Sequence, residues 1–589
     1  MKFKEVDLAS RFFEFSDLKE LLKYSARKYG DKTAFVTKIK EKGSKAVSYK
    51  NTSYGELYDE MIALGTSLYD MGYNERRVAI IGENSYQWCL AYFTAGSGIG
   101  VTVPLDKALE RDEIVSCLKR SNATIIFYDK KMEKLIDEIF ESGETNLEFA
   151  VTLNFKSENP SRPSVDEMIA KGRELISAGN KDYEDFQIDR NKMAFLLFTS
   201  GTTQQSKAVM LSHKNFMSCL YGMCCEELFF VDDVNLQLLP LHHCYGMLGL
   251  LTFLVQGMKN TFCDGLKYIN KNLKEYKVTV MMSVPLLLES IYKKINKAIA
   301  SQGQEKKIAF ALKLCDMSEK VGIDIRRKMF KPIIDQLGGH LRFFINGAAP
   351  IDPVVAEGLN DFGILTVNGY GLTETAPTIA SESYRHLKAG SVGKLMPNVE
   401  AKIVEPNDEG IGELVVRGDN VMLGYYDDED ATNEVLIDGW FHTGDLAYFD
   451  EEGYLFITGR KKNVIVMKNG KNVFPEEIEN LVNILPYVSE SMLFTRNKHS
   501  DVVLWLKVVY EDDYLKEHNI TIDELEEKFQ KDLDEINATM PAVKRVHKYF
   551  LSDRPTIKTT TQKTKRNIEI EEINKELAER GLTDFVLTD

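Results

Sequence analysis

The chain has 589 residues, of which 44% are hydrophobic and 28% are charged, and its formal net charge is −15 at pH 7. This length is sufficient for several domains, or for one large α/β domain with a deep core and a smaller companion. The excess of negative charge argues against a protein whose main surface binds nucleic acid.

The cysteines and the apolar segments indicate the compartment. All eight cysteines lie in the first 315 residues without paired Cys-x-x-Cys spacing, which favours reduced thiols over a disulfide scaffold. The amino-terminus lacks the apolar run of a signal peptide, and the most apolar stretch, 236–255, is interrupted by Pro240, His242 and His243. We therefore expect a cytoplasmic protein with no transmembrane segment.

Two helices are expected near the amino-terminus. Ser16 is positioned to cap a helix that begins near Leu18 and ends at Gly30. Ser53 and Glu56 have the spacing of a capping box at the start of a second amphipathic helix.

Short apolar segments alternate with these and later helices, as expected of an open, parallel-rich sheet whose faces are covered by helices. The segments expected to form strands are 78–81, 123–128, and those that begin at Met193, Thr279, Leu341 and Ile364.

The strand expected at 193–198 is followed at once by hydroxyl side chains, a glycine and a lysine. Hydroxyl donors, close backbone approach and a mobile positive charge suit the oxygens of a polyphosphate. A common P-loop is less suitable, because Ser206 replaces its second glycine and Ala208 its magnesium-binding hydroxyl. A plain polar surface loop is the other alternative. The residues concerned are Thr199, Ser200, Gly201, Thr202, Thr203 and Lys207.

Ligands of open α/β sheets bind at the carboxyl ends of the strands. Three of the expected strands end in unusual sequences, at Pro285, at Asn346-Gly-Ala-Ala-Pro350 and at Asn368-Gly-Tyr-Gly-Leu-Thr-Glu374. We expect these three loops to line one pocket.

The sequence pattern changes near residue 400. Short alternating strands with turn signals predict a small β subdomain over about 400–460, and a separate α+β pattern follows Lys461 and Lys462. We predict a large N-terminal domain over 1–460 and a C-terminal α+β domain over 461–589.

Five motifs occur in a fixed order, and together they resemble the adenylate-forming (AMP-binding) superfamily, most closely its long-chain fatty acid CoA ligases. The motifs are Thr199–Thr203 with Lys207, Asn346–Pro350, Asn368–Glu374, Trp440-Phe-His-Thr-Gly-Asp445, and the Lys558–Arg566 segment that contains Lys563. The resemblance covers nearly the whole chain and implies an α/β fold with a mobile C-terminal domain.

The resemblance assigns the nucleotide contacts. It implies that the loop with Lys207 binds the β- and γ-phosphates of ATP, although Gln204, Ser206 and Ala208 depart from the family pattern. Tyr370 would stack on adenine, Thr373 would contact the α-phosphate, and Glu374 would hold Mg2+. For several of these residues ordinary packing or solvation is the alternative. The remaining implied contacts are Gly347, Ala348 and Ala349 at adenine, Asn368, Gly369 and Gly371 around Tyr370, and Asp445, Ile457 and Arg460 at the ribose.

A further segment, Leu239-Pro-Leu-His-His-Cys-Tyr-Gly246, resembles the family's carboxylate site. His243 matches the position that covers the acyl group, with core packing or metal ligation as alternatives. The candidates for the acyl pocket are His243, Tyr245, Ser283 and Pro285.

Near the carboxyl end, the resemblance makes Lys563 the adenylation lysine and Lys462 the hinge, although Gln562 replaces the usual glycine. A solvated basic segment is the alternative for residues 558–566.

These assignments imply an ATP- and Mg2+-dependent ligase that converts a medium- or long-chain fatty acid to acyl-AMP and then transfers the acyl group to CoA. Two alternatives are open at this point: transfer to the phosphopantetheine of an acyl carrier protein, and a degenerate nucleotide- or acyl-binding protein.

Overall fold

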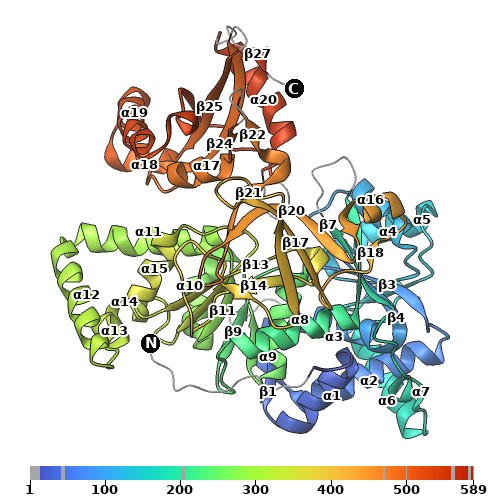
Figure 1. Ribbon diagram of the computed structural model, residues 1–589. Helices are drawn as coiled ribbons and strands as arrows, with labels where there is room; N and C mark the ends of the chain where they lie inside the picture. Colours follow the sequence, from blue (N-terminus) through green and yellow to red (C-terminus); the bar gives the residue numbers. More distant parts are fainter. Residues whose placement is uncertain are drawn as a thin grey trace. The chain divides into compact units, whose positions relative to one another are not determined.

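The computed structural model describes residues 14–40, 47–199, 206–467, 471–498, 501–558, 564–581 and 586–587. The chain forms two compact units (Figure 1). The first comprises mainly Met1–Thr199, Lys207–Ala401 and Val416–Phe441, and the second mainly Lys402–Val415 and His442–Asp589. Each unit is described by itself.

The larger sheet of the first unit is parallel over most of its width. Within the described residues its strands run in the order β15-β14-β13-β12-β11-β9-β10-β1-β2, and only the outer pairs are antiparallel. The strands are β15 (Lys394–Leu395), β14 (Thr378–Ser381), β13 (Leu365–Gly371), β12 (Phe343–Asn346), β11 (Val280–Ser283), β9 (Val234–Gln237), β10 (Lys259–Phe262), β1 (Thr33–Lys40) and β2 (Val47–Ser53).

A second sheet in the same unit has the order β18-β8-β7-β4-β3-β5-β6. Strands β4, β3, β5, β6 and β7 run parallel, whereas β8 returns antiparallel to β7. The strands are β18 (Gly424–Tyr425), β8 (Lys207–Ser212), β7 (Met193–Thr199), β4 (Gly100–Leu105), β3 (Arg76–Ile81), β5 (Ile125–Tyr128) and β6 (Phe149–Thr152). These two sheets confirm the predicted parallel-rich α/β fold.

Helices cover both sheets. The apolar helices α3 (Tyr86–Thr94) and α9 (Cys244–Val255) are buried on almost all sides and therefore lie in the interior of the unit. The other helices are α1 (Leu18–Tyr29), α2 (Tyr54–Asp70), α4 (Arg111–Ser121), α5 (Glu133–Ser142), α6 (Val165–Ser177), α7 (Asp182–Asp185), α8 (His213–Glu226), α10 (Ile269–Tyr276), α11 (Pro285–Ser301), α12 (Glu305–Lys320), α13 (Arg326–Met329), α14 (Lys331–Gln336), α15 (Pro353–Asp361) and α16 (Glu429–Val435).

The predicted amino-terminal helices are present, with one correction. Ser53 and Glu56 form the capping box of α2 as expected. Helix α1 ends at Gly30 as predicted, but its cap is Asp17, whose carboxylate accepts the backbone N–H of Glu20, and not Ser16. An ionised carboxylate is the stronger acceptor at a helix N-terminus, where the helix dipole also favours negative charge.

A small sheet is formed by strands from residues 399–460. It contains β16 (Val399–Val404), β17 (Gly412–Gly418), β19 (Leu436–Ile437), β20 (Trp440–Phe449) and β21 (Leu455–Arg460). These strands lie in the range over which the sequence predicts a small β subdomain, about 400–460.

The carboxyl part of the second unit is an α+β fold. Apolar side chains of α17, β24, β25 and α19, among them Val482, Leu493, Leu506 and Phe529, form its core. The elements are β22 (Ile465–Val466), β23 (Asn472–Val473), α17 (Pro475–Asn483), β24 (Val488–Lys498), β25 (Asp501–Tyr510), α18 (Asp512–His518), α19 (Ile522–Thr539), β26 (Lys548–Ser552), α20 (Arg566–Glu579) and β27 (Val586–Leu587).

No disulfide joins the eight cysteines, all of which lie in the described ranges. Across those same ranges, no helix has the length and apolar character needed to cross a bilayer.

Candidate active site

The three unusual loop sequences begin on adjacent strands at one sheet edge. Ser283 and Asn346 end β11 and β12 and lie side by side in register, and Asn346 pairs in turn with Asn368 in the middle of β13. The side-chain amide of Asn346 donates to Oδ1 of Asn368 at 3.2 Å. The structure therefore brings these segments together at the edge where an open α/β sheet binds its ligands.

Glu382, which directly follows β14, orients Asn368 through two hydrogen bonds. Its Oε2 accepts the backbone N–H of Asn368 at 3.0 Å and the side-chain amide at 2.8 Å, and its Oε1 accepts the N–H of Lys388 at 2.7 Å. Burial raises the pKa of Glu382 to about 7, against the lowering effect of these hydrogen bonds. No sequence motif identifies this residue, because a lone glutamate 14 positions after Asn368 resembles any surface carboxylate.

Two glycines of the motifs are required by packing. A Cβ on Gly347 would lie 2.8 Å from the ring of Tyr245, and one on Gly371 would lie 1.7 Å from the carbonyl oxygen of Pro377. Gly369-Tyr370-Gly371, which we expected in a turn, belongs to strand β13 and pairs with β14. Ala348 has a φ of 72°, and Ala349 follows it.

Glu374, Tyr425 and Lys207 form a cluster in the first unit. The hydroxyl of Tyr425 donates to Oε1 of Glu374 at 2.9 Å, and Nζ of Lys207 lies 4.4 Å from the centre of the Tyr425 ring. Thr373 and Glu374 lie in a short 3-10 turn directly after β13. Tyr425 reaches the site because β18 pairs with β8, a contact between segments more than 200 residues apart that the sequence did not reveal.

The oxygens of Glu374 suit a metal that also binds phosphate. Its Oε2 makes no hydrogen bond within the described residues, whereas Oε1 is oriented by Tyr425. Mg2+ is commonly bound by one or two carboxylates together with substrate phosphates and water, so this donor set fits. No cluster of three or more His, Cys, Asp or Glu side chains suitable for a metal occurs among the described residues.

The predicted phosphate segment connects β7 to β8. Thr199 is the last residue of β7, and its hydroxyl donates to the carbonyl of Lys207, the first residue of β8, at 3.3 Å. Ser200, Gly201, Thr202 and Thr203 lie outside the described residues.

The candidates for the acyl site lie around the start of α9. The Nε2 atoms of His242 and His243 are 3.1 Å apart, and Nε2 of His242 is 3.6 Å from Asp106. Burial lowers the pKa of His242 to about 3, so this ring is neutral near pH 7. Tyr245 donates to the carbonyl of Ile345 at 3.0 Å, which ties α9 to the end of β12.

Ser283 and Pro285, the other two candidates for the acyl site, are both buried. Pro285 is the first residue of α11, where its missing N–H costs no helical hydrogen bond.

In the second unit, Asp445 and Arg460 face each other across β20 and β21, and Nε of Arg460 is 3.0 Å from Oδ1 of Asp445. Ile457 lies on the same strand as Arg460 and pairs with Ala447. The Asp445–Arg460 ion pair thus places a nearly buried carboxylate beside a guanidinium.

Glu413 accepts a hydrogen bond from the backbone directly before Asp445. This residue was not identified from the sequence. Its Oε1 accepts the N–H of Gly444 at 3.2 Å, and its Oε2 lies 2.9 Å from Nζ of Lys461 and 3.3 Å from Nδ1 of His442. Burial alone would raise the pKa of Glu413, but Lys461 and His442 outweigh it and hold the pKa below its ordinary value.

Lys462 lies in a short 3-10 turn between two anchored neighbours. Lys461 is paired with Glu413, and the side-chain amide of Asn463 donates to Oε1 of Glu476 at 2.6 Å.

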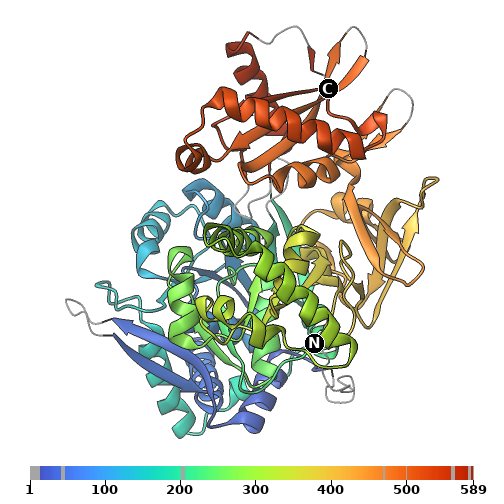
Figure 2. The ribbon, with the colours of Figure 1, turned by 90° about the vertical axis from the view of Figure 1, so that its left-hand side faces the viewer.

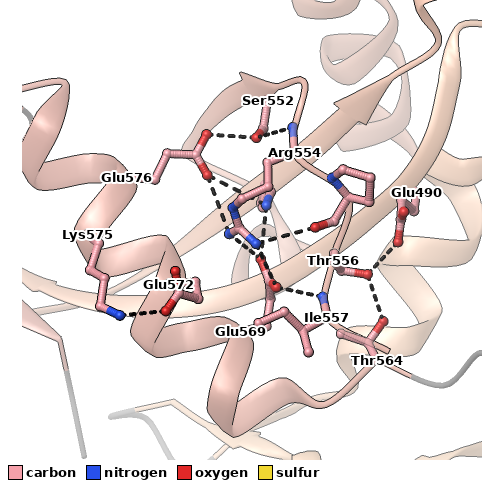
Figure 3. A network of polar contacts seen from close by, with 12 residues as sticks. Glu490, Ser552, Arg554, Thr556, Ile557, Thr564, Glu569, Glu572, Lys575 and Glu576 are labelled. Atoms are coloured by element: carbon pink, nitrogen blue, oxygen red, sulfur yellow. Dashed lines mark hydrogen bonds and ion pairs between the residues drawn. The ribbon is translucent and has the colours of Figure 1, made fainter. Parts of the chain in front are cut away.

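Lys563 lies outside the described residues, but both flanks of its segment are described. Residues 558 and 564 form an isolated antiparallel bridge, the hydroxyls of Thr556 and Thr564 are 3.3 Å apart, and the N–H of Lys565 donates to the carbonyl of Ile557 at 2.8 Å. The segment therefore begins and ends at one closed base, seen in Figure 3 at Thr556 and Thr564.

Glu569, on helix α20, fixes this base. Its Oε2 accepts the backbone N–H of Ile557 at 2.8 Å, and its Oε1 accepts from Arg554 at 2.7 Å (Figure 3). The same Oε1 also accepts from the buried Lys507 at 2.9 Å. Burial alone would raise the pKa of Glu569, but these donors hold it below the ordinary value. The carboxylate is thus ionised and fully engaged.

Comparison with known proteins identifies the family. A model described as "AMP-binding enzyme" matches residues 22–426, and one described as "AMP-binding enzyme C-terminal domain" matches residues 462–580. Long chain acyl-CoA synthetase 4 of Arabidopsis thaliana is 30% identical over 462 residues, covering 73% of this chain and 69% of that protein. The peroxisomal long chain acyl-CoA synthetase 6 of the same plant is 30% identical over 535 residues, covering 86% and 76%.

Solved structures share the fold. The anthranilate CoA ligase AuaEII in complex with anthranoyl-AMP has a TM-score of 0.74 at 19% identity, covering 97% of this chain and 99% of that one. ATP-bound MatB from Rhodopseudomonas palustris has a TM-score of 0.71 at 24% identity, covering 95% and 99%. The fold and the resemblance predicted from the motifs are therefore confirmed, and this chain belongs to the AMP-binding enzyme family.

Proposed function

We propose that this protein is an AMP-forming acyl-CoA ligase, which activates a medium- or long-chain fatty acid with ATP and transfers the acyl group to CoA. The names of the relatives, long-chain acyl-CoA synthetases that match most of the chain, support this reaction class. The observation in the structure that carries the proposal is the cluster of Glu374, Tyr425 and Lys207 beside the β7–β8 hairpin.

In the first step the fatty acid carboxylate attacks the α-phosphorus of ATP, and pyrophosphate leaves. Negative charge grows on the phosphate oxygens, so fixed positive groups lower the barrier without a covalent enzyme intermediate. Lys207 and Lys563 have this role in our proposal, and Thr373 contacts the α-phosphate.

Magnesium would be held by Glu374 and would supply Lewis-acid neutralisation of the phosphate oxygens. Tyr425 orients that carboxylate through the hydrogen bond to Oε1.

We propose that residues of several motifs contact the adenosine part of ATP. Tyr370 stacks on the base within the Asn368–Gly371 strand end, beside Gly347, Ala348 and Ala349. Asp445 accepts the ribose hydroxyls, as an ionised carboxylate with two oxygens can, and Arg460 and Ile457 lie on the neighbouring strand.

In the second step, after the C-terminal domain has moved, the thiol of CoA attacks the carbonyl carbon of the acyl-AMP, so that a thioester forms and AMP leaves. We propose that this motion occurs at or beside Lys462, which makes 460/461 the boundary between the two domains. A hinge requires only a few residues that can change backbone angles.

His243, Tyr245, Ser283 and Pro285 are the proposed acyl-pocket residues.

The free cysteine thiols favour a reducing compartment, and we propose the cytoplasm.

The test is ATP-dependent pyrophosphate release with a panel of carboxylic acids, with and without CoA, while the thioester is followed by mass. We expect thioester formation with one class of chain length and its loss in Lys563→Ala. Acyl-AMP without CoA thioester would instead indicate a carrier-protein acceptor, and ATP binding without turnover of any acid would indicate a degenerate binding protein.

A further inference from the structure

Helix α12 carries apolar side chains on two opposite faces. Its inner face, with Ala311 and Cys315, packs into a core cluster of the first unit. Its outer face exposes Phe310 by 63%, Met317 by 66% and, directly after the helix, Val321 by 73%. Because these three residues are separated by seven and four positions, they lie along one side of the helix.

This outer row does not belong to the core. Helix α12 already packs against the core through its inner face. Large apolar side chains exposed in a row differ from the single exposed apolar residues that are scattered over an ordinary protein surface. In Figure 1 helix α12 lies at the left edge of the first unit, beyond α11 and α14, and Figure 2 shows it from that side.

Lysines border the apolar row on both sides. Lys306, Lys313 and Lys320 recur every seven residues along one side of it, and Lys307 lies on the other. All four are exposed, and none of them makes an ion pair within the described part of the chain.

The acidic residues of α12 are turned away from this face. Helical spacing places Glu305, Asp316 and Glu319 at least about a quarter-turn beyond the row. Asp316 and Glu319 are also paired with Arg326, at 3.0 and 2.8 Å. Residues 285–331 contain eleven Lys and Arg against five Asp and Glu, in a chain whose net charge is −15.

We propose that this face of α12, defined by Phe310, Met317 and Val321 with the four bordering lysines, docks on an anionic lipid bilayer. An apolar stripe flanked by lysines is suited to the boundary between headgroups and acyl chains, where apolar burial and attraction to anionic lipid act together. A second copy of the chain would bring the same lysines together, and like charges oppose such a contact. The docking would bring the enzyme to a reservoir of acyl chains, but it does not depend on the proposed function.

Vesicle flotation tests the proposal without turnover. We expect the full chain to bind phosphatidylcholine vesicles that contain phosphatidylglycerol, to bind pure phosphatidylcholine more weakly, and to be released by salt. The triple variant Phe310→Ser, Met317→Ser, Val321→Ser is expected to reduce the partition coefficient by about tenfold or more, as is a triple Lys306→Glu, Lys313→Glu, Lys320→Glu variant. Leu266→Ser, at a residue exposed by 71% outside α12, is the matched control.

Site-specific insertion is measured with tryptophan. Phe310→Trp is expected to shift its emission to the blue and to be quenched by brominated lipid, whereas Leu266→Trp is not. Unchanged thermal unfolding of each variant shows that the fold is retained, as expected for exposed positions.

Four outcomes would overturn the proposal, and the first three concern vesicles and self-association. They are the absence of binding to either kind of vesicle, binding that the α12 variants leave unchanged, and concentration-dependent self-association that Phe310→Ser abolishes. Binding to an acidic protein in place of vesicles, with the Phe310→Trp emission unchanged by lipid, would assign the face to a protein partner and equally overturn it.

Discussion

Arg460 and Asp445 face each other across β20 and β21, with Nε of the arginine 3.0 Å from Oδ1 of the aspartate. The cross-strand pairing fixes the carboxylate in one orientation, and only 4% of Asp445 is exposed. The proposed ribose contact is therefore set by the strand register before any nucleotide binds.

Asp445→Asn tests that contact. The amide keeps the shape but loses the charge, and a hydrogen bond to a charged group contributes about 1.5–3 kcal/mol. We expect the KM for ATP to rise by roughly tenfold to a hundredfold, with a smaller change in the KM for the acid. Asp438→Asn, in an exposed turn of the first unit with a φ of 50°, is the control and should leave both constants unchanged. A lower melting temperature with an unaltered KM for ATP would show that the pair is only structural.

Tyr425→Phe tests the support of the proposed magnesium ligand. Removing the hydroxyl takes away the donor to Oε1 of Glu374, and loss of such an outer hydrogen bond typically costs 10–100-fold in metal affinity. We expect the Mg2+ concentration for half-maximal activity to rise by about tenfold at saturating ATP. Tyr426→Phe is the neighbouring control. Equal magnesium dependence in the two variants would remove Glu374 from its proposed role.

Glu382 predicts a pH dependence of stability. Burial raises its pKa to about 7 in the folded state, above the ordinary value of 4.5. Between these values the folded state binds more protons than the unfolded state, so the free energy of unfolding falls as pH rises through this window. The contribution is on the order of 3 kcal/mol and is fully present only below the unfolded pKa.

Denaturant unfolding of the wild type and of Glu382→Gln from about pH 4 to about pH 8 measures this term. We expect the stability of the wild type relative to the variant to decrease as pH rises, and to level off above pH 7. His386 is close enough to influence Glu382, so a His386→Gln background separates the two titrations. A difference that stays constant with pH would contradict the assignment.

The strands and helix ends of the fold could be predicted from the sequence, whereas the residues that orient the proposed site residues could not. The buried strands, the capping box of Ser53 and the end of α1 at Gly30 follow from local patterns in the sequence. Tyr425 and Glu413, in contrast, reach their partners through pairings between distant strands or through burial of an isolated charge, for which no local pattern exists. The role of Gly371 is similar, because the Pro377 carbonyl that excludes a side chain there lies directly before the return strand β14.

Glu569 is expected to position the segment of Lys563. It accepts the N–H of Ile557 at the base of that segment and is held by Arg554 and Lys507. In Glu569→Gln one acceptor oxygen becomes a donor, so the base loses either the Ile557 bond or the Arg554 bond, which loosens the segment.

Because Lys563 is proposed to act only in adenylation, the two half-reactions should respond differently. We expect pyrophosphate exchange in Glu569→Gln to fall by about tenfold or more, while thioester formation from supplied acyl-AMP stays within about twofold of the wild type. Glu572→Gln is the control on the same helix, since the one ion pair of Glu572 among the described residues is with the exposed Lys575, at 2.6 Å (Figure 3). Equal losses in both half-reactions, with a lowered melting temperature, would show that Glu569 stabilises the domain without positioning the lysine. If pyrophosphate exchange were unchanged in Glu569→Gln but lost in Lys563→Ala, the catalytic role of Lys563 would be supported and its positioning by Glu569 would be rejected.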